Sequence, residues 1–324
     1  MEQTNLGRSG LKVSRLCLGT MNFGPFADEN KSHDIMDKAI EIGINFFDTA
    51  NVYGWKMGDG ITEKIIGSWF ANESSRREKV VLATKVYGKM GEGPNDRGLS
   101  KHHIIRACED SLERLNTDRI DLYQMHHVER TTPYEEIWEA MEQLVRDGKV
   151  LYIGSSNFAG WDIAKAQAAA NSRNFMGLVS EQHKYTLSCR LPELEVLPSC
   201  RDHGIGIIPW SPLDGGILSG SAFKAKGKVR TADKFAREKA DEFKTNIEDY
   251  YKFCAEIDES PADVTIAWLL HNDAVTAPII GPRNEEQLTG IIRALEIKLD
   301  DESLRKIDEI WPGPGGAAPE AYAW

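Results

Sequence analysis

The sequence lacks the paired cysteines of a disulfide-stabilised protein. It contains five cysteines in 324 residues, and this odd set shows no paired spacing. Small secreted domains instead carry even sets of cysteines that form a disulfide framework. The first seven residues also lack the basic and then apolar layout of a signal peptide. These two absences predict reduced thiols and a cytoplasmic location.

Long apolar runs are missing as well. No uninterrupted apolar segment approaches the ~20 residues that an α-helix needs to span a bilayer. Hydrophobic residues make up 41% of the chain and charged residues 27%, which is typical of a soluble globular protein. We therefore predict no membrane-spanning segment.

The chain also has too little positive charge for a binder of polyanions. Its 39 Lys and Arg residues face 50 Asp and Glu residues, which gives a formal net charge of −11. Proteins that bind nucleic acid or anionic membranes usually present a basic face. The composition argues against both partners, and a phosphate-bearing ligand would need local positive groups.

The sequence does contain a repeated alternation of short apolar strands and amphipathic helices. A hairpin is predicted over residues 6–13, and strands over 14–19, 45–48, 79–85, 120–126, 150–154, 177–182, 205–210 and 275–280. Helices are predicted between the strands over 32–42, 62–70, 100–115, 135–146, 161–170, 192–203, 235–257 and 261–271, and after the last strand over 285–295 and 301–310. Because no linker interrupts the alternation, it predicts an α/β fold in which residues 1–324 form one (β/α)₈ TIM barrel domain, with an N-terminal β-hairpin and extra C-terminal helices.

Polar residues gather at the carboxyl ends of these strands, which is where such barrels place their active sites. The strands end in or run into Gly19 and Thr20, Asp48, Lys85, His126, Ser156 and Asn157, Gln182, Trp210 and Gly281. Tyr53 follows from the loop after the second barrel strand. A single Lys or His in such a place is more often structural. Their coincidence at one rim favours a catalytic site.

Four of these residues have complementary chemistry. A tyrosine has a reference pKa of about 10, so it becomes a useful acid near neutrality only if a cation stabilises its phenolate. Lys85 is the candidate cation for Tyr53, and Asp48 would keep a partly buried Lys85 charged. His126 remains to hydrogen-bond a substrate oxygen.

Several motifs resemble those of the aldo-keto reductase family over essentially the whole chain. They lie at 18–20, 43–54 with an Asp-Thr-Ala-x-x-Tyr core, 82–85, 121–126, 154–158, 210–213 and 278–283. Their spelling is closest to the bacterial and channel-subunit-like branches. The resemblance places the catalytic tetrad on Asp48, Tyr53, Lys85 and His126. It implies NADPH-dependent reduction of an aldehyde or ketone, with the proton from Tyr53.

The same resemblance implies a site for NADPH or NADP⁺, with NADH possible. Ser156, Asn157 and Gln182 would hold the nicotinamide carboxamide, and Trp210 would stack on the ring. Ser211, Leu213 and Gly216 would follow the pyrophosphate, while Arg283 and Gln287 would meet the adenosine end. Gly19, Thr20, Met21 and Gly281 complete the expected contacts.

The chain departs from the family pattern in the loop after the seventh strand. Residues 218–221 read Leu-Ser-Gly-Ser where related proteins usually have a Lys after Leu-x-Gly. Lys224, Lys226 or Arg230 could replace that pyrophosphate contact, and we include Arg230 among the expected cofactor residues.

Further departures fall on the adenine side and beside the tetrad. Gly290 and Ile291 occupy the positions where the family places Glu and Asn against adenine. Glu181 replaces the frequent Asn before Gln182, and His127 follows the catalytic His126.

The expected substrate pocket has flat and amphipathic walls. Its residues are Met21, Phe23, Trp55, Tyr87, His127 and Trp210. Aromatic faces suit the C–H surfaces of a sugar, so the pocket predicts a sugar-like or hydroxylated carbonyl. The tail after Pro312 would be either a loose terminus or a lid over this opening.

Two other functions compete with the reductase. A metal-dependent hydrolase is suggested by the pairs His102-His103 and His126-His127, but adjacent histidines on a strand face opposite ways and no His-x-His ends the first strand. His102 and His103 are predicted to be surface residues, and no metal site is expected. The second alternative is a cofactor-binding regulatory subunit with little turnover. The substrate's identity and the oligomeric state stay open.

Overall fold

The structure is a computed structural model that describes residues 1–220 and 234–323. The expected contact at Arg230, and its substitutes Lys224 and Lys226, lie outside these described residues.

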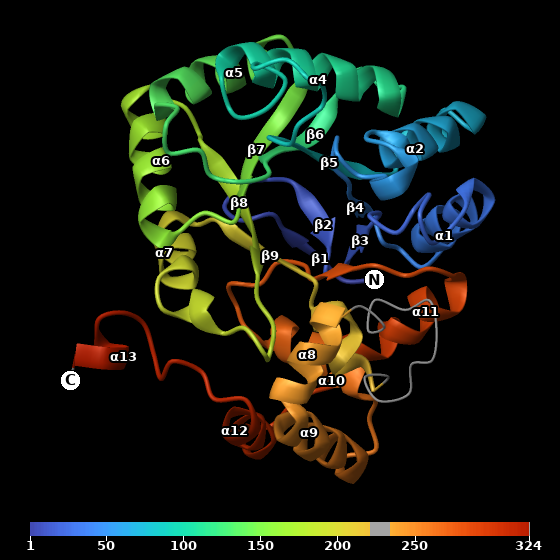
Figure 1. Cartoon of the computed structure of the whole chain (residues 1–324), viewed down its shortest axis with the longest axis vertical. Coiled ribbons are helices and arrows are strands. Elements are labelled where there is room, and N and C mark those ends of the chain that lie inside the picture. Colours follow the sequence, from blue (N-terminus) through green and yellow to red (C-terminus); the bar gives the residue numbers. More distant parts are fainter. Residues whose placement is uncertain (221–233, 324) are drawn as a thin grey trace.

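Eight parallel strands form the predicted barrel (Figure 1). Their order is β10-β3-β4-β5-β6-β7-β8-β9, and each strand pairs with its neighbour in parallel. The strands are β3 (Cys17–Gly19), β4 (Phe46–Asp48), β5 (Val81–Val86), β6 (Ile120–Met125), β7 (Val150–Ser156), β8 (Leu178–Lys184), β9 (Gly206–Trp210) and β10 (Ile279–Ile280). A parallel bridge from Ile207 of β9 to Val275 links the two edges of the sheet.

The predicted hairpin closes the amino-terminal end of the barrel. Strands β1 (Gln3–Asn5) and β2 (Lys12–Ser14) pair antiparallel, and Leu6 and Val13 pack into the core inside the barrel. The turn requires glycine at position 7, where φ is +54° and a Cβ would lie 2.4 Å from the carbonyl oxygen of Val179. Because the hairpin covers the amino-terminal end, a ligand can approach the barrel only at the end where the strands have their carboxyl termini.

Helices surround the sheet (Figure 1), and most of them bury one face against the barrel or against a neighbouring helix. They are α1 (Glu29–Glu41), α2 (Ile61–Asn72), α3 (Ser75–Glu78), α4 (Lys101–Leu115), α5 (Tyr134–Arg146), α6 (Gly160–Ser172), α7 (Val196–His203), α8 (Lys234–Glu242), α9 (Lys244–Glu256), α10 (Pro261–His271), α11 (Glu285–Gly290), α12 (Asp301–Ile310) and α13 (Glu320–Ala323). The side chains of Asp28, Ser100, Ser260 and Asp300 cap the helices that follow them by accepting a backbone N–H. These caps explain why several helices begin where the sequence predicts.

Short 3-10 helices account for several differences from the predicted elements. They are η1 (Trp55–Met57), η2 (Leu191–Glu193), η3 (Asp214–Ser219) and η5 (Ile291–Leu295). The helix predicted over 192–203 starts later because Pro192 belongs to η2. The helix predicted over 285–295 divides into α11 and η5, and the one over 235–257 divides at Phe243, which packs on Trp311. The eighth predicted strand is reduced to two residues, β10.

The prediction that His103 lies on the surface is wrong. Its exposed fraction is 3%, because it lies on the inner face of α4 one turn before Ala107. His102 is exposed, as predicted.

The tail packs beside η2 instead of over the barrel. The backbone N–H of Ala318 donates to the carbonyl of Leu194 at 2.9 Å, and Arg190 donates to the carbonyl of Trp311. Helix α13 then projects away from the barrel (Figure 1), and Tyr322 is 72% exposed. As far as Ala323, where the described residues end, the tail does not form a lid.

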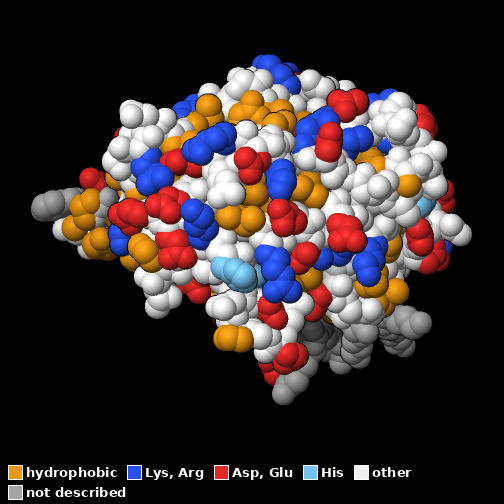
Figure 2. All heavy atoms as spheres, turned by 90° about the horizontal axis from the view of Figure 1, so that it is seen from above, with side chains coloured by type: hydrophobic (Ala, Val, Ile, Leu, Met, Phe, Trp, Pro, Cys, Tyr) orange, Lys and Arg blue, Asp and Glu red, His pale blue; other side chains and the backbone are white. Residues whose placement is uncertain are grey.

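Charges of both signs alternate on the face that carries α4 and α5 (Figure 2). Lys149, in the turn after α5, pairs with Glu109 of α4 at 2.8 Å, and Lys101 of α4 pairs with Glu139 of α5 at 3.4 Å. This face therefore presents no broad basic patch to a polyanion. In the part of the chain that the structure describes, no helix has both the length and the apolarity to cross a membrane.

Candidate active site

A buried chain of polar contacts joins three of the four predicted tetrad residues. Asp48 ends β4, and Lys85 extends from the neighbouring strand β5. The Lys85 Nζ lies 2.6 Å from Asp48 Oδ2, 2.8 Å from the carbonyl oxygen of Thr49 and 3.1 Å from Tyr53 Oη. Lys85 is completely buried and Asp48 is 3% exposed. The structure thus brings an ammonium group directly to the phenol oxygen.

The charge of Lys85 is maintained by these neighbours. Burial alone lowers the pKa of its ammonium group, but the negative charge of Asp48 and the contact with Tyr53 outweigh burial and raise the pKa above its usual value. The second oxygen of Asp48 accepts hydrogen bonds from Gln124 Nε2 at 2.9 Å and Gln182 Nε2 at 2.8 Å. A carboxylate with this many donors can be buried without an unsatisfied charge.

His126 lies beside Tyr53 as a neutral imidazole. Its ring meets the Tyr53 ring edge-on, with ring centroids 5.9 Å apart. Burial, and then the positive charges of Lys85 and His127, lower the pKa of His126 to about 3. A neutral imidazole at this position can exchange a hydrogen bond with a substrate oxygen but adds no charge to it.

The residues expected at the nicotinamide end form one connected group. Asn157 Oδ1 accepts from the indole Nε1 of Trp210 at 3.0 Å, while its Nδ2 donates to Ser156 Oγ at 2.9 Å and to the carbonyl of His126 at 3.2 Å. Ser156 also pairs with Gln182 across β7 and β8. Asn157 therefore fixes Trp210 relative to the tetrad.

The expected pyrophosphate residues lie in a turn with unusual backbone angles. Ser211, Asp214, Gly215 and Gly216 all have positive φ values between 47° and 103°. Asp214 holds this turn, because its carboxylate contacts Ser188 at 2.6 Å, Lys184 at 3.2 Å and the Lys239 ammonium group. Sequence reasoning did not identify Asp214, since its partners come from other elements.

The loops after β3 and β10 meet at the expected adenosine end. Asn22 Nδ2 donates to the carbonyl of Gly281 at 2.7 Å, and the guanidinium carbon of Arg283 lies 4.5 Å from the centroid of the Phe26 ring. Gln287 Oε1 accepts from the backbone N–H of Arg283 at 2.9 Å. Arg283 is thus held from two sides beside the rim.

Two residues of the expected cofactor site lie where β3 ends. Gly19 and Thr20 are fully buried, and Thr20 Oγ1 donates to the carbonyl of Asp48 at 2.9 Å. They hold the end of β4 in this structure. Met21 is half-buried at the same rim.

The expected pocket residues are only partly together. Trp55 is 53% exposed and meets Phe26 edge-on, and Tyr87 packs against His127 with ring centroids 5.5 Å apart. Phe23 is fully buried in the hydrophobic core, so its side chain borders no open space. This burial corrects its expected place in the pocket wall.

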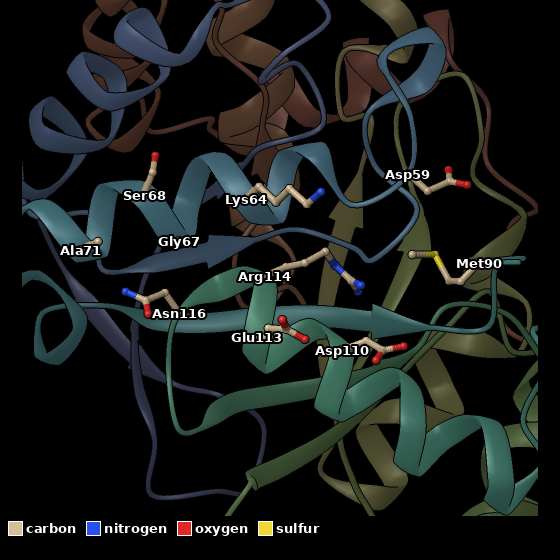
Figure 3. A pocket seen from close by; sticks show the side chains of 10 residues that line it. All are labelled: Asp59, Lys64, Gly67, Ser68, Ala71, Met90, Asp110, Glu113, Arg114 and Asn116. Carbon is tan, nitrogen blue, oxygen red and sulfur yellow. The ribbon is translucent and has the colours of Figure 1, made fainter.

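A surface groove of about 760 Å³ lies elsewhere, between α2 and α4 (Figure 3). Its ten lining residues include Lys64 and Arg114, and none of them is a predicted site residue. Arg114 is turned to the buried Glu63, 2.7 Å away. The groove is therefore a packing feature between helices and not part of the candidate site.

The donor set fits a nicotinamide dinucleotide better than a metal ion. Amide, hydroxyl and indole groups surround the tetrad, and the buried Oδ1 of Asn22 has no hydrogen-bond partner within the described chain. Over residues 1–220 and 234–323, no group of three or more His, Cys, Asp or Glu side chains is arranged to hold a metal ion. The described residues therefore offer no set of metal ligands that would support a metal-dependent hydrolase.

Comparisons with known proteins agree with this geometry. Residues 15–312 match the model of the aldo/keto reductase family. The chain is 57% identical to an uncharacterized oxidoreductase, YrpG, of Bacillus subtilis, over the full length of both proteins. It is 34% identical to a probable voltage-gated potassium channel subunit beta of Oryza sativa, over 96% of each chain. It is also 31% identical to the versiconal hemiacetal acetate reductase of Aspergillus parasiticus, over 95% of this chain and 96% of the relative.

The family model spans nearly all of the barrel, and relatives named as oxidoreductases align along the whole chain. The chain belongs to the aldo/keto reductase family of NAD(P)H-dependent oxidoreductases.

Proposed function

We propose that this protein reduces an aldehyde or ketone to the alcohol with NADPH, and that Tyr53 donates the proton. The observation that carries the proposal is the buried contact chain from Asp48 through Lys85 to Tyr53 Oη, with distances of 2.6 Å and 3.1 Å. A fully buried ammonium group beside a phenol favours the phenolate that proton donation leaves behind.

Each tetrad residue then has one role. Tyr53 Oη gives its proton to the carbonyl oxygen as the alcohol forms. Lys85 stabilises the remaining phenolate, and Asp48 keeps Lys85 charged in its buried position. His126 hydrogen-bonds the same substrate oxygen and orients it. When bound, the reduced nicotinamide supplies the hydride.

The cofactor would follow the rim of the barrel. Ser156, Asn157 and Gln182 would hold the carboxamide, and Trp210 would cover one face of the nicotinamide. The turn with Ser211, Leu213 and Gly216 would contact the pyrophosphate, and Gly281, Arg283 and Gln287 the adenosine end. The support for this placement is that Asn157 and Trp210 are hydrogen-bonded to each other beside the tetrad.

We propose NADPH as the preferred cofactor because of Arg283. A guanidinium group can donate two parallel hydrogen bonds to a 2′-phosphate that NADH lacks. The Phe26 ring, 4.5 Å from the guanidinium carbon, supports its plane.

The substrate we propose is a sugar-like or hydroxylated carbonyl. Trp55 and the packed pair of Tyr87 and His127 offer flat faces with polar atoms, and a pocket lined by them would suit the alternating C–H and O–H surfaces of such molecules. A panel of aldoses, ketoses, hydroxy-ketones and aromatic aldehydes, followed by loss of NADPH absorbance, tests this class. Preference for large, wholly apolar carbonyls would contradict it.

The reaction is tested by Tyr53→Phe. The variant should fold, bind cofactor and lose turnover by ~10²–10⁴-fold, as expected for a lost proton donor. Tyr152→Phe is a matched control, because Tyr152 packs against the core cluster inside the barrel and touches none of the tetrad contacts above. Wild-type turnover in Tyr53→Phe would refute the assignment.

A regulatory subunit with little turnover is a second candidate, favoured by the relatives named as channel beta subunits. The two candidates are separated by single-turnover reduction with the substrate panel. Reduction of no carbonyl, together with tight cofactor binding, would favour the regulatory protein.

We further propose that residues 1–324 form one domain. The hairpin packs into the barrel core, and Trp311, directly after α12, packs on Phe243 and Tyr250 of the helical layer. Limited proteolysis that released a separately folded fragment would contradict this.

A further inference from the structure

Glu181 is a completely buried carboxylate directly behind the candidate active site. It precedes Gln182 on β8, and successive side chains on a strand point to opposite faces. Gln182 points into the barrel, where it donates to Asp48. Glu181 therefore points outward, beneath the surrounding helices, and it cannot reach a substrate.

Three donors converge on the two oxygens of Glu181. Oε2 accepts from Ser155 Oγ at 2.5 Å, and Oε1 accepts from the backbone N–H of Phe158 at 3.0 Å. His183 Nδ1 lies 2.9 Å from Oε1. A buried charge with three hydrogen-bonding partners holds them strongly, because charged hydrogen bonds gain strength away from water.

Two of these partners flank the segment that carries Ser156 and Asn157. Ser155 precedes this pair and Phe158 follows it, so Glu181 accepts hydrogen bonds from both ends of the segment. Asn157 itself has a φ of +59°, in the left-handed region that asparagine enters more readily than most non-glycine residues. The carboxylate holds the residues on both sides of this turn from outside the barrel.

The constraint extends to the indole ring. Asn157 Oδ1 accepts from Trp210 Nε1 at 3.0 Å, and Asn157 Nδ2 donates to the carbonyl of His126. A movement of the 155–158 segment would therefore shift the amide of Asn157 and release Trp210. Glu181 therefore helps to position Asn157 and Trp210 through hydrogen bonds within the protein.

We propose that Glu181 is a positioning residue that sets the nicotinamide end of the cofactor site through the 155–158 segment. This inference rests on the proposed function, in which Ser156, Asn157 and Trp210 hold the nicotinamide. It predicts that loss of Glu181 weakens binding of the nicotinamide half of the cofactor and leaves binding of the adenosine half unchanged.

The experiment compares two ligands by calorimetry. NADP⁺ spans both halves of the site, whereas 2′,5′-ADP occupies only the adenosine half. Glu181→Ala should weaken NADP⁺ binding by about tenfold, which corresponds to the loss of about one hydrogen bond to the ligand. Its affinity for 2′,5′-ADP should equal that of the wild type, which also shows that the variant is folded. If the protein prefers NAD⁺, NAD⁺ and ADP form the equivalent pair.

Two further variants and one control make the test conclusive. Ser155→Ala removes one donor and keeps the carboxylate, so it should weaken NADP⁺ binding in the same direction but less, even if Glu181→Ala does not fold. Glu181→Gln keeps an acceptor for the Phe158 N–H and should recover most of the affinity. Glu63→Ala is the matched control, because Glu63 is also fully buried and accepts from Thr84 and Arg114, away from this segment.

The outcomes separate this inference from the proposed function. If Asn157→Ala binds NADP⁺ like the wild type, the proposed nicotinamide site is wrong. If Asn157→Ala weakens NADP⁺ binding but Glu181→Ala and Ser155→Ala do not, only the role of Glu181 falls. Equal weakening of NADP⁺ and 2′,5′-ADP in the Glu181 variants would reduce Glu181 to general structural support.

Discussion

Replacement of Lys85 by Met should separate the catalytic role of this residue from its structural one. Lys85 Nζ is 3.1 Å from Tyr53 Oη. With an effective dielectric constant of about 20, a unit charge at that distance stabilises a phenolate by about 5 kcal/mol, and Asp48 offsets part of this. Because about 1.4 kcal/mol corresponds to tenfold in rate, we expect Lys85→Met to lose ~10²–10⁴-fold in turnover, the range of a disabled proton donor.

The same change should destabilise the fold for a different reason. It leaves the buried carboxylate of Asp48 without its cation, which typically costs about 3–5 kcal/mol. Gln124 and Gln182 still donate to Asp48, so we expect a loss near the lower end of that range. The double variant Asp48→Asn with Lys85→Met removes both charges, and it should recover most of the stability without recovering turnover.

Urea unfolding and single-turnover loss of NADPH absorbance measure the two effects independently. Met and Lys have similar lengths, so the single variant creates little cavity. A Lys85→Met enzyme that is less stable but turns over like the wild type would refute the catalytic role and leave Lys85 as a structural rim residue. Recovery of turnover in the double variant would refute the electrostatic argument as well.

Three further results are expected. The pKa of His126 is lowered to about 3 in the folded protein, from an unfolded value near 6.5. Between these pH values the unfolded chain therefore binds one more proton than the folded protein does. As the pH falls through this window, the contribution of His126 to the free energy of unfolding decreases by about 1.4 kcal/mol per pH unit. Urea unfolding at pH 6.5 and 4.5 should show this slope in the wild type but not in His126→Gln; an equal slope in both would contradict the neutral imidazole. Arg283→Ala should raise KM for NADPH and leave KM for NADH unchanged, whereas unaltered NADPH kinetics would mean that Arg283 serves only its own loop. Deletion of residues 320–324 should change neither KM nor kcat, because α13 projects away from the barrel; a raised KM for several carbonyls would restore the lid.

The sequence was sufficient to predict the alternation of strands and helices and the residues at the strand ends. An apolar run rarely carries a charge through its middle, so Asp48 and Lys85 predict the carboxyl ends of buried strands, and the ends of parallel strands share one rim. The contact of Lys85 with Asp48 and Tyr53 follows from that arrangement. The helix start at Ser100 was also predicted from the sequence, because capping is a local interaction.

Other features depend on contacts between residues that are distant in the chain. Asp214 stabilises its turn through contacts with Ser188 and Lys239. Glu181 accepts a hydrogen bond from Ser155 on the neighbouring strand β7. His103 is buried although it begins a helix, and Phe23 lies in the core although it follows a strand end. Whether a side chain faces the core, the site or solvent depends on strand register and helix rotation.

The chemical groups of the site were therefore determined by the sequence alone, since residue type and place along each strand are local properties. The exact partners of those groups were decided by tertiary structure. Gln124 and Gln182 turn to Asp48, and Asn157 joins Trp210 to the backbone of His126, only because the barrel closes and brings five separate strands to one rim. Hydrogen bonds between residues more than 25 positions apart leave no periodic signal in a single sequence, so this network becomes visible only once the strands are packed.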